Sequence, residues 1–423
     1  MEQSESSGAG SGRSESGLKA SLSLLGRNPN FRNLYIASLA SYAGDWFLTV
    51  ALLGLVLQIT HSALAASLVL VAQELPFFLV SPIAGALADR MDRQKLMVFA
   101  DLARAVTVLG LLFLNGSSRL WIAYAIPAVE SALASFFEPA STAAVPNLVE
   151  PKDLSTANAL AGSAWGTMLA VGAALGALVA ATFGSNVAFI CDSISFLVSA
   201  ALLSRIHTAF SEKRDQDEVH VGVVEATRET VRYARGDHRV VALLAVKGGF
   251  GLAGGVIVLL SVFGTKVFHD GDIGIGVLMS ARGIGALTGP FIGKRIAGDS
   301  FPRLFVAIGL ALVTFGFFYL LLPLAPSLLV AAACAAGAHL GGGAQWSLST
   351  YGLQRIVPDR IRGRVFAFDV ALITLTIAIS SLAAGAAAQL WGPRIAMGVT
   401  AALALGYAGL WWWATRRVRA ALR

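Results

Sequence analysis

Twelve apolar stretches of about 20 residues or more recur along this chain of 423 residues, and they constrain its fold more than any other feature. An apolar helix of that length spans the hydrocarbon core of a bilayer. The stretches cover residues 34–58, 62–88, 96–114, 119–138, 157–182, 185–206, 240–268, 273–293, 302–323, 326–349, 364–390 and 393–415. Strand-length segments of alternating polarity, which indicate a membrane barrel, do not occur. We therefore predict an all-α membrane protein with twelve transmembrane helices.

The composition excludes most soluble classes of protein. Apolar residues make up 56% of the chain and charged residues 13%, and the mean hydropathy is +0.70. Soluble domains carry about 25% charged residues, so a cytosolic enzyme, a nucleic-acid-binding protein or a disordered scaffold is excluded. Cys191 and Cys334 each lie in an apolar stretch without a CxxC or Cys/His spacing. We therefore expect neither a disulfide framework nor a metal site.

The positive charge predicts the orientation of the chain in the membrane. The net charge is +7, and 26 of the 32 Lys and Arg residues fall on one side if both termini face the cytoplasm. The outer loops then hold only Arg119, Lys266 and Arg394. Because basic residues concentrate in cytoplasmic loops, we predict cytoplasmic termini in the cell membrane and no nucleic-acid partner.

A long polar stretch divides the predicted spans into two sets of six. We expect a disordered, Ser- and Gly-rich cytoplasmic tail without a cleavable signal peptide at 1–31 and a basic tail at 416–423. Two pseudo-symmetric six-helix halves at 32–206 and 240–415 flank a cytoplasmic linker at 207–239. The halves repeat short motifs at matching places, such as LVEP after the fourth span and RIVPDR after the tenth. Parallel six-helix repeats are typical of secondary transporters that bind substrate between the halves.

The most specific motif is GALADRMDRQK at residues 85–95, between the second and third spans. It resembles the signature of the major facilitator superfamily, although Asp92 stands where many members have Gly. The resemblance implies a cytoplasmic latch that holds the outward-open state, with Asp101 and Arg104 as its predicted partners. The predicted latch residues are Gly85, Asp89, Arg90, Arg93, Asp101 and Arg104.

Three further segments narrow the resemblance: GDW at 44–46, ANAL at 157–160 and VPDRIRGRVF at 357–366. Together they are similar to a subgroup that holds the enterobactin exporter and macrolide-efflux permeases. This implies a secondary active transporter whose halves rock about a central cavity. The expected activity is export of an amphipathic drug, macrolide-like or siderophore-like molecule against a proton gradient. An importer or a lipid flippase of the same fold stays open, as does sodium coupling.

Ionisable side chains inside the spans are costly to insert, about 3 kcal/mol each, and are therefore candidates for function. At a rise of about 1.5 Å per residue, Asp45 lies near the bilayer midplane. We predict that it is a coupling carboxylate that binds and releases a proton during transport. Glu74 and Glu130 are predicted to bind substrate or to share that role. Trp46 is predicted to stack on a large planar substrate.

Besides Arg104, which is assigned to the latch, two basic side chains fall within the spans, Lys247 and Arg282. A cation at that depth needs an acceptor, either an acid of the other half or an anionic substrate, so we predict a gate or a substrate contact for each. Asp192 is expected in solvent near the outer surface. Asp369 is expected beside Arg364 near the inner face.

The sequence lacks the signs of an ATP-driven pump or an intramembrane enzyme. No P-loop pattern occurs, and no spacing indicates a metal site at membrane depth. We expect no enzymatic activity, no ATPase subunit, and no nucleotide, metal or organic cofactor. The expected partners are a small-molecule substrate, protons and membrane lipids, and the expected state is a monomer.

Overall fold

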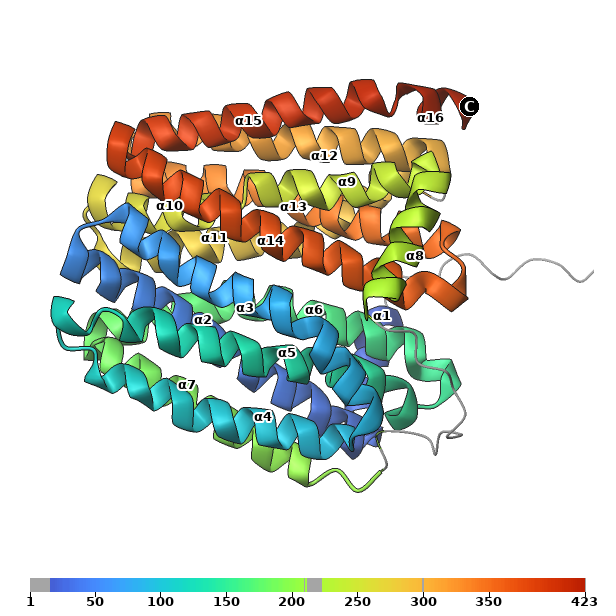
Figure 1. Cartoon of the computed structure of the whole chain (residues 1–423), viewed down its shortest axis with the longest axis horizontal. Helices are drawn as coiled ribbons and strands as arrows, with labels where there is room; N and C mark the ends of the chain where they lie inside the picture. Colours follow the sequence, from blue (N-terminus) through green and yellow to red (C-terminus); the bar gives the residue numbers. More distant parts are fainter. Residues whose placement is uncertain (1–15, 209, 211–222, 299, 423) are drawn as a thin grey trace, which may run out of the picture.

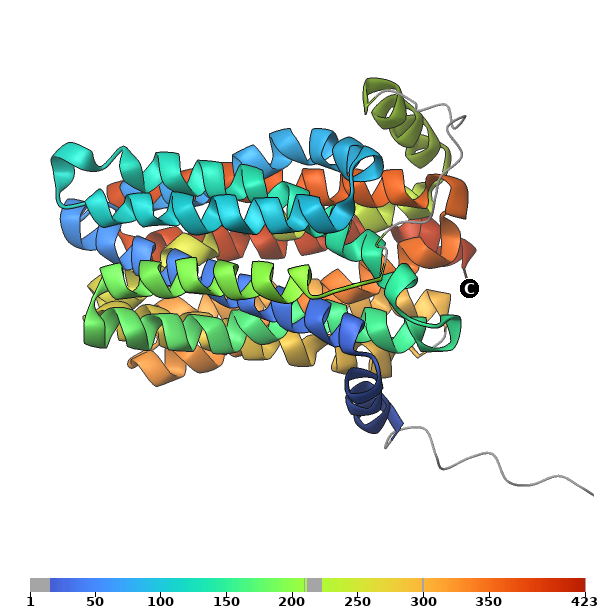
Figure 2. The same ribbon diagram turned by 90° about the horizontal axis from the view of Figure 1, so that it is seen from below.

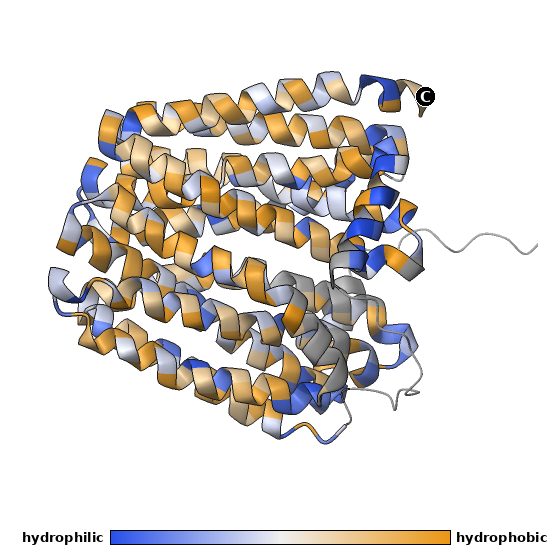
Figure 3. Cartoon of the chain, viewed as in Figure 1, coloured by the Kyte–Doolittle hydropathy of each residue, from blue (hydrophilic) through white to orange (hydrophobic). Residues whose placement is uncertain are grey.

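The computed structural model describes residues 16–208, 210, 223–298 and 300–422, apart from some side chains within helices. Within these residues the regular structure is helical, and twelve helices are long and apolar enough to cross a membrane. Figure 3 shows apolar residues along these helices and hydrophilic residues gathered at the two ends of the bundle. The predicted fold class is confirmed, and the chain is an integral multi-pass membrane protein.

The first six spans are α2 (Pro29–Thr60), α3 (Ala63–Arg90), α4 (Arg93–Val108) with its continuation η1 (Leu109–Phe113), α5 (Ile122–Leu148), α6 (Leu154–Phe183) and α7 (Ser185–Ser204). The last six are α9 (His238–Leu252) with α10 (Val256–Val262) and η4 (Phe263–Val267), then α11 (Gly271–Ala297), α12 (Phe301–Leu321), α13 (Leu328–Ile356), α14 (Asp359–Trp391) and α15 (Pro393–Ala414). In Figure 1 the first six lie below the last six. Helix α1 (Ser16–Arg27) and the C-terminus lie at the same end of the bundle, the terminus-bearing end, which is on the right in Figures 1 and 2.

Small residues allow the two halves to approach closely. A Cβ atom at Gly283 of α11 would lie only 2.5 Å from the backbone of Ala170 on α6. At Gly385 of α14, a Cβ would lie 2.5 Å from the Ser67 hydroxyl on α3. Both contacts join helices of different halves, so glycine at these positions determines how closely the halves pack.

The seventh span is broken where α9 ends and α10 begins. Ser380 of α14 bridges the break: its hydroxyl accepts from the Gly255 N–H at 3.0 Å and donates to the Gly251 carbonyl at 2.7 Å. Backbone groups freed within a membrane need such a partner, because lipid offers none. The break is therefore stabilised by a neighbouring helix.

The segments outside the spans differ from the expectation in one respect. Residues 16–27 are predicted to be disordered, but the structure places them in α1. Leu24 is buried there against Phe31 and Leu34 at the terminus-bearing end, and this packing supports a helix that composition alone does not predict. Residues 1–15 lie outside the described part. In the predicted linker, α8 (Val223–Gly236) precedes the seventh span.

Candidate transport site

Arg104 forms the centre of a polar cluster in the N-terminal half. Its Nε donates to Glu130 of α5 at 3.1 Å, its Nη1 donates to the Ser41 hydroxyl of α2 at 3.2 Å, and its Nη2 is paired with Asp45. The ring of Phe196 on α7 lies 4.0 Å from the guanidinium carbon. Four helices thus meet at one guanidinium, whose planar donors suit two carboxylates at once.

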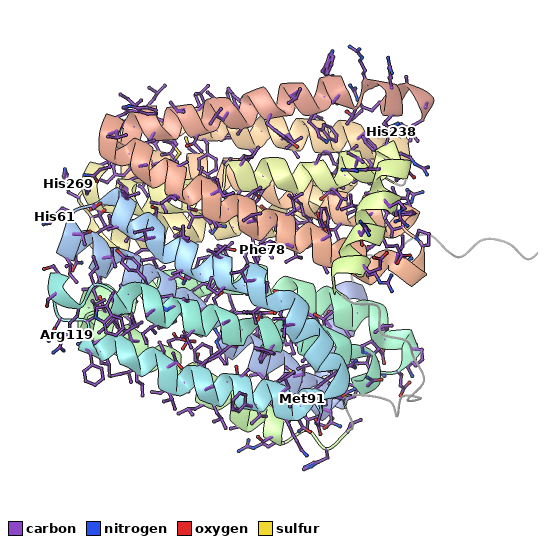
Figure 4. All side chains as sticks on the ribbon, in the orientation of Figure 1. His61, Phe78, Met91, Arg119, His238 and His269 are labelled. Atoms are coloured by element: carbon purple, nitrogen blue, oxygen red, sulfur yellow. The ribbon has the colours of Figure 1, made fainter. Side chains whose placement is uncertain are left out.

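The two acids of this cluster differ in their access to solvent. The side chains of Arg104 and Glu130 are each 3% exposed, whereas that of Asp45 is 38% exposed. In Figure 4, His61 and Met91 mark the opposite ends of α3 and give the depth of the bundle, and Arg104 lies in the middle of its own span. Asp45 is therefore the more exposed of the two acids that pair with Arg104.

Two further acids surround the same guanidinium. Asp101 lies one turn before Arg104 on α4, and Asp192 lies on α7; both are 0% exposed and both act electrostatically on Arg104. Neither carboxylate oxygen of Asp192 has a hydrogen-bond partner among the described residues. The expectation that Asp192 is solvated near the outer surface is wrong, because α2 covers it: a Cβ at Gly44 would overlap its carboxylate.

Glu138 is a further acid near this cluster that the sequence pattern does not single out. This residue of α5 accepts a hydrogen bond from the Tyr42 hydroxyl at 2.8 Å. Both line a cavity of about 260 Å³ near the terminus-bearing end. Glu138 is the last residue of the predicted span 119–138, a position at which an acid is expected at the membrane surface. Its place in a cavity becomes clear only from its contact with Tyr42 on α2.

A second ion pair is buried in the C-terminal half. Lys247 of α9 is paired with Asp369 of α14, and their side chains are 4% and 0% exposed. The Lys247 ammonium also lies 4.6 Å from the ring centroid of Trp346 on α13. The expectation that Asp369 lies beside Arg364 is wrong: Arg364 pairs instead with Glu229 of α8.

Arg282 of α11 lies where the two halves meet. Its Nε donates to His339 Nε2 at 2.8 Å, so the proton of the neutral imidazole is on Nδ1, 2.9 Å from the Tyr319 hydroxyl. The guanidinium carbon is 5.8 Å from the ring centroid of Trp46, across the interface. Glu74 of α3 acts on it electrostatically, without an ion pair among the described residues. The structure thus brings together three predicted residues, one from the C-terminal half and two from the N-terminal half.

The residues of the predicted latch lie in two places. Arg93 is 9% exposed and donates to the Phe210 carbonyl at 3.1 Å. Asp101 and Arg104 lie deeper, in the cluster with Asp45. Gly85 lies within α3, and the side chains of Asp89 and Arg90 lie outside the described part of the chain.

Comparisons with known proteins agree with this architecture. A family model described as "Transmembrane secretion effector" matches residues 20–422. The putative bacilysin exporter BacE of Bacillus subtilis (strain 168) is 26% identical over 354 residues, which are 84% of this chain and 87% of that protein. The multidrug efflux pump Tap of Mycolicibacterium fortuitum is 28% identical over 355 residues, 78% of this chain and 82% of the pump.

Solved structures show the same fold. A bacterial homolog of the human lysosomal transporter Spinster, in an inward-facing and occupied conformation, superposes with a TM-score of 0.72 at 12% identity. It covers 91% of this chain and 96% of that one. The nucleoside transporter NupG gives a TM-score of 0.69 at 11% identity and covers 91% and 99%. These proteins are transporters and not enzymes.

Proposed function

Because this chain belongs to the transmembrane secretion effector family of major facilitator transporters, we propose that it exports an amphipathic small molecule in exchange for protons. The terminus-bearing end faces the cytoplasm in this proposal, in agreement with the distribution of Lys and Arg. The printed names of two relatives, "Putative bacilysin exporter BacE" and "Multidrug efflux pump Tap", support export. The proton gradient supplies the energy, without a nucleotide, metal or organic cofactor.

The cluster around Arg104 is the observation that carries proton coupling. Four carboxyl groups, Asp45, Glu130, Asp101 and Asp192, act on one guanidinium, so full ionisation would leave an excess of negative charge in the interior. Uncompensated charge is costly there, and bound protons relieve it. Asp45 is the exposed member and already paired with Arg104. When Asp45 binds a proton, its ion pair with Arg104 weakens. Because this ion pair joins α2 to α4, protonation changes how these two helices pack.

Aromatic side chains supply the apolar surface for a substrate. Trp46 of α2 lies 6.4 Å from Trp165 of α6, centroid to centroid, and Trp346 of α13 lies 6.0 Å from Phe250 of α9. Each half therefore contributes a pair of rings next to a buried cation, Arg282 for the first pair and Lys247 for the second. Amphipathic ligands suit sites of rings with few charged groups.

Everted membrane vesicles with an acidic interior test the proposal. Macrolides, dyes and catecholate siderophores are added one at a time, and proton release from the vesicles is recorded. We expect at least one compound to release protons and to accumulate inside. If folded protein gives no proton release with any compound, export by proton exchange is contradicted, and an importer or a lipid flippase becomes the better account.

A further inference from the structure

We infer that the protein binds the phosphate group of an anionic phospholipid between Lys266 of η4 and Arg394 of α15. This site lies at the end of the bundle opposite the termini, which His61 and His269 mark in Figure 4. The two cations line one surface cavity of about 450 Å³. Its other lining residues are Val267, Trp391, Gly392, Pro393 and Ile395. The inference concerns a site apart from the Arg104 cluster and does not rest on the proposed function.

The cavity lies where three membrane spans have their ends. The seventh span ends at Val267, the eleventh ends at Trp391 and the twelfth begins at Pro393. Trp391 is 56% exposed, and an exposed indole at the end of a span is typical of the headgroup level of a bilayer. Lipid phosphates lie at this level, so they are the anions that the cavity meets at the highest concentration.

The lining of the cavity holds two cations and no acid. Lys266 donates to the His61 carbonyl, and Arg394 donates to the Pro323 carbonyl. Within the described residues neither cation forms an ion pair. An ammonium has three donors and a guanidinium has five, so each side chain keeps donors for a further acceptor. A phosphate diester supplies both the acceptors and the negative charge.

Basic residues are rare at this end of the bundle, which makes their meeting in one cavity informative. The loops here hold only Arg119, Lys266 and Arg394, and two of the three line the same cavity although they are far apart in the sequence. Arg119 belongs to η2 (Ser117–Arg119) in the N-terminal half and donates to the Phe113 carbonyl at 3.3 Å. It is a matched basic residue at the same end and outside the cavity (Figure 4).

Apolar side chains beside the cations suit the acyl chains of a lipid. Ile395 lines the cavity and is 59% exposed, and Leu390, which precedes Trp391 on α14, is 76% exposed. A free anion such as inorganic phosphate gains nothing from this apolar surface, whereas a phospholipid buries part of its chains against it. The surroundings of the two cations therefore favour a lipid over a free anion.

The site also lies at a contact between the two halves. His61, whose carbonyl accepts from Lys266, caps the C-terminal end of α2 in the N-terminal half. Pro323, which holds Arg394, belongs to η5 (Leu322–Leu324) in the C-terminal half. A phosphate that binds both cations therefore acts on a hydrogen bond that joins the halves.

Trp391 can report lipid contact from within the site. Full-length protein is placed in phosphatidylcholine vesicles that contain brominated phosphatidylglycerol or brominated phosphatidylcholine at the same mole fraction. Bromine quenches indole emission on contact, and the difference between each protein and its Trp391→Phe form isolates the emission of Trp391. We expect phosphatidylglycerol to bind about tenfold more tightly than phosphatidylcholine, since each cation near a membrane surface contributes about fivefold and salt screens part of this.

Variants at the two cations test the assignment. Lys266→Gln combined with Arg394→Gln should remove the preference for phosphatidylglycerol, whereas Lys266→Arg combined with Arg394→Lys keeps both charges and should keep it. Arg119→Gln is the matched control and should bind both lipids as the wild type does. If the double Gln variant does not fold, salt tests the same charges in the wild type: raising its concentration about tenfold should weaken the preference.

Equal quenching of Trp391 by the two lipids in the wild type would overturn the inference. A preference that persists in the folded double Gln variant, or one that does not respond to salt, would do the same. Inorganic phosphate separates a lipid from a free anion: at millimolar concentration and constant ionic strength, it should leave the preference as it is in chloride. If phosphate abolishes the preference, the cavity takes a free anion and the lipid assignment is wrong.

Discussion

Arg104 and Glu130 form an ion pair between α4 and α5, 3.1 Å from Nε to Oε2, in which both side chains are 3% exposed. Asp45 of α2 forms a second ion pair with the same guanidinium. A buried pair stabilises a protein only if its remaining donors and acceptors are satisfied. Ser41 and the two carboxylates satisfy three nitrogens of Arg104, whereas Glu130 Oε1 has no hydrogen-bond partner among the described residues. The cluster therefore links α2, α4 and α5. In the proposed function its net charge changes when Asp45 binds a proton.

Removing the cation of this cluster should destabilise the fold. Arg104→Met leaves the surrounding acids without their partner, and we expect a loss of about 3–5 kcal/mol in the free energy of unfolding. Arg104→Lys should lose less unfolding free energy, since lysine keeps the positive charge although it lacks the planar set of donors of the guanidinium. Denaturant unfolding in detergent measures both. Arg228→Met on exposed α8 is the control, and equal stability of the two Met variants would contradict the prediction.

The Lys247–Asp369 pair should show strong coupling. Lys247→Met or Asp369→Leu alone leaves one buried charge without a partner and should cost about 3–5 kcal/mol. The double variant replaces both charges with apolar groups and should recover most of that loss. A double-mutant cycle of unfolding free energies measures the coupling. Additive losses would show that the two side chains do not depend on each other.

A larger side chain at Gly283, where the two halves pack closely, should destabilise the protein. Gly283→Val pushes against the Ala170 backbone, and we expect a loss of about 1–3 kcal/mol together with slower transport. Gly406→Val is the matched control, because nothing lies within 4 Å of a Cβ there. Thermal unfolding and vesicle transport are compared for the two. A Gly283→Val protein that matches the control in both assays would contradict the account of the interface.

Asp237 should give a pH-dependent contribution at the start of α9. Its carboxylate accepts from the Arg239 N–H at 2.8 Å, and the hydrogen bonds with the Arg239 side chain hold the pKa of Asp237 below its ordinary value of 3.8. A lowered pKa means that the stabilisation is complete above the ordinary value and is lost as the pH falls through the lowered one.

Replacement of Asp237 tests whether its contribution to stability falls as the pH falls. Asp237→Ala should cost about 1 kcal/mol at neutral pH, the usual value of a helix cap. The difference from the wild type should shrink as the pH falls below about 4. Unfolding of the two proteins is compared across this range. A difference that grows at low pH would show that the carboxylate is not the stabilising form.

The sequence predicts the spans well because apolar length is a local property. Helix ends are less predictable: α2 begins at Pro29, five residues before the predicted start at 34, because Asn28 caps a polar first turn by accepting the Phe31 N–H at 2.9 Å. Helix α1 is missed because its burial depends on contacts of Leu24 with a neighbouring helix.

The candidate site is predictable residue by residue but not in its pairings. Hydropathy singles out Asp45, Glu130 and Arg282 as costly charges, and it says nothing of which helix faces meet. Arg104 is assigned to the latch from a motif near its span, whereas the fold turns it toward Asp45. Glu138 is missed because its depth alone does not distinguish a cavity from the membrane surface.

In the proposed function Asp45 carries the proton that drives export, and uphill transport by an Asp45→Asn protein is the decisive test. Everted vesicles with an imposed proton gradient are given a compound that the wild type exports, and accumulation and proton release are recorded together. We predict that Asp45→Asn loses both, while Glu225→Gln, which changes an exposed acid of α8, retains both. If Asp45→Asn still accumulates the compound against its gradient and releases protons, Asp45 is not the coupling group and the account of the cluster is contradicted.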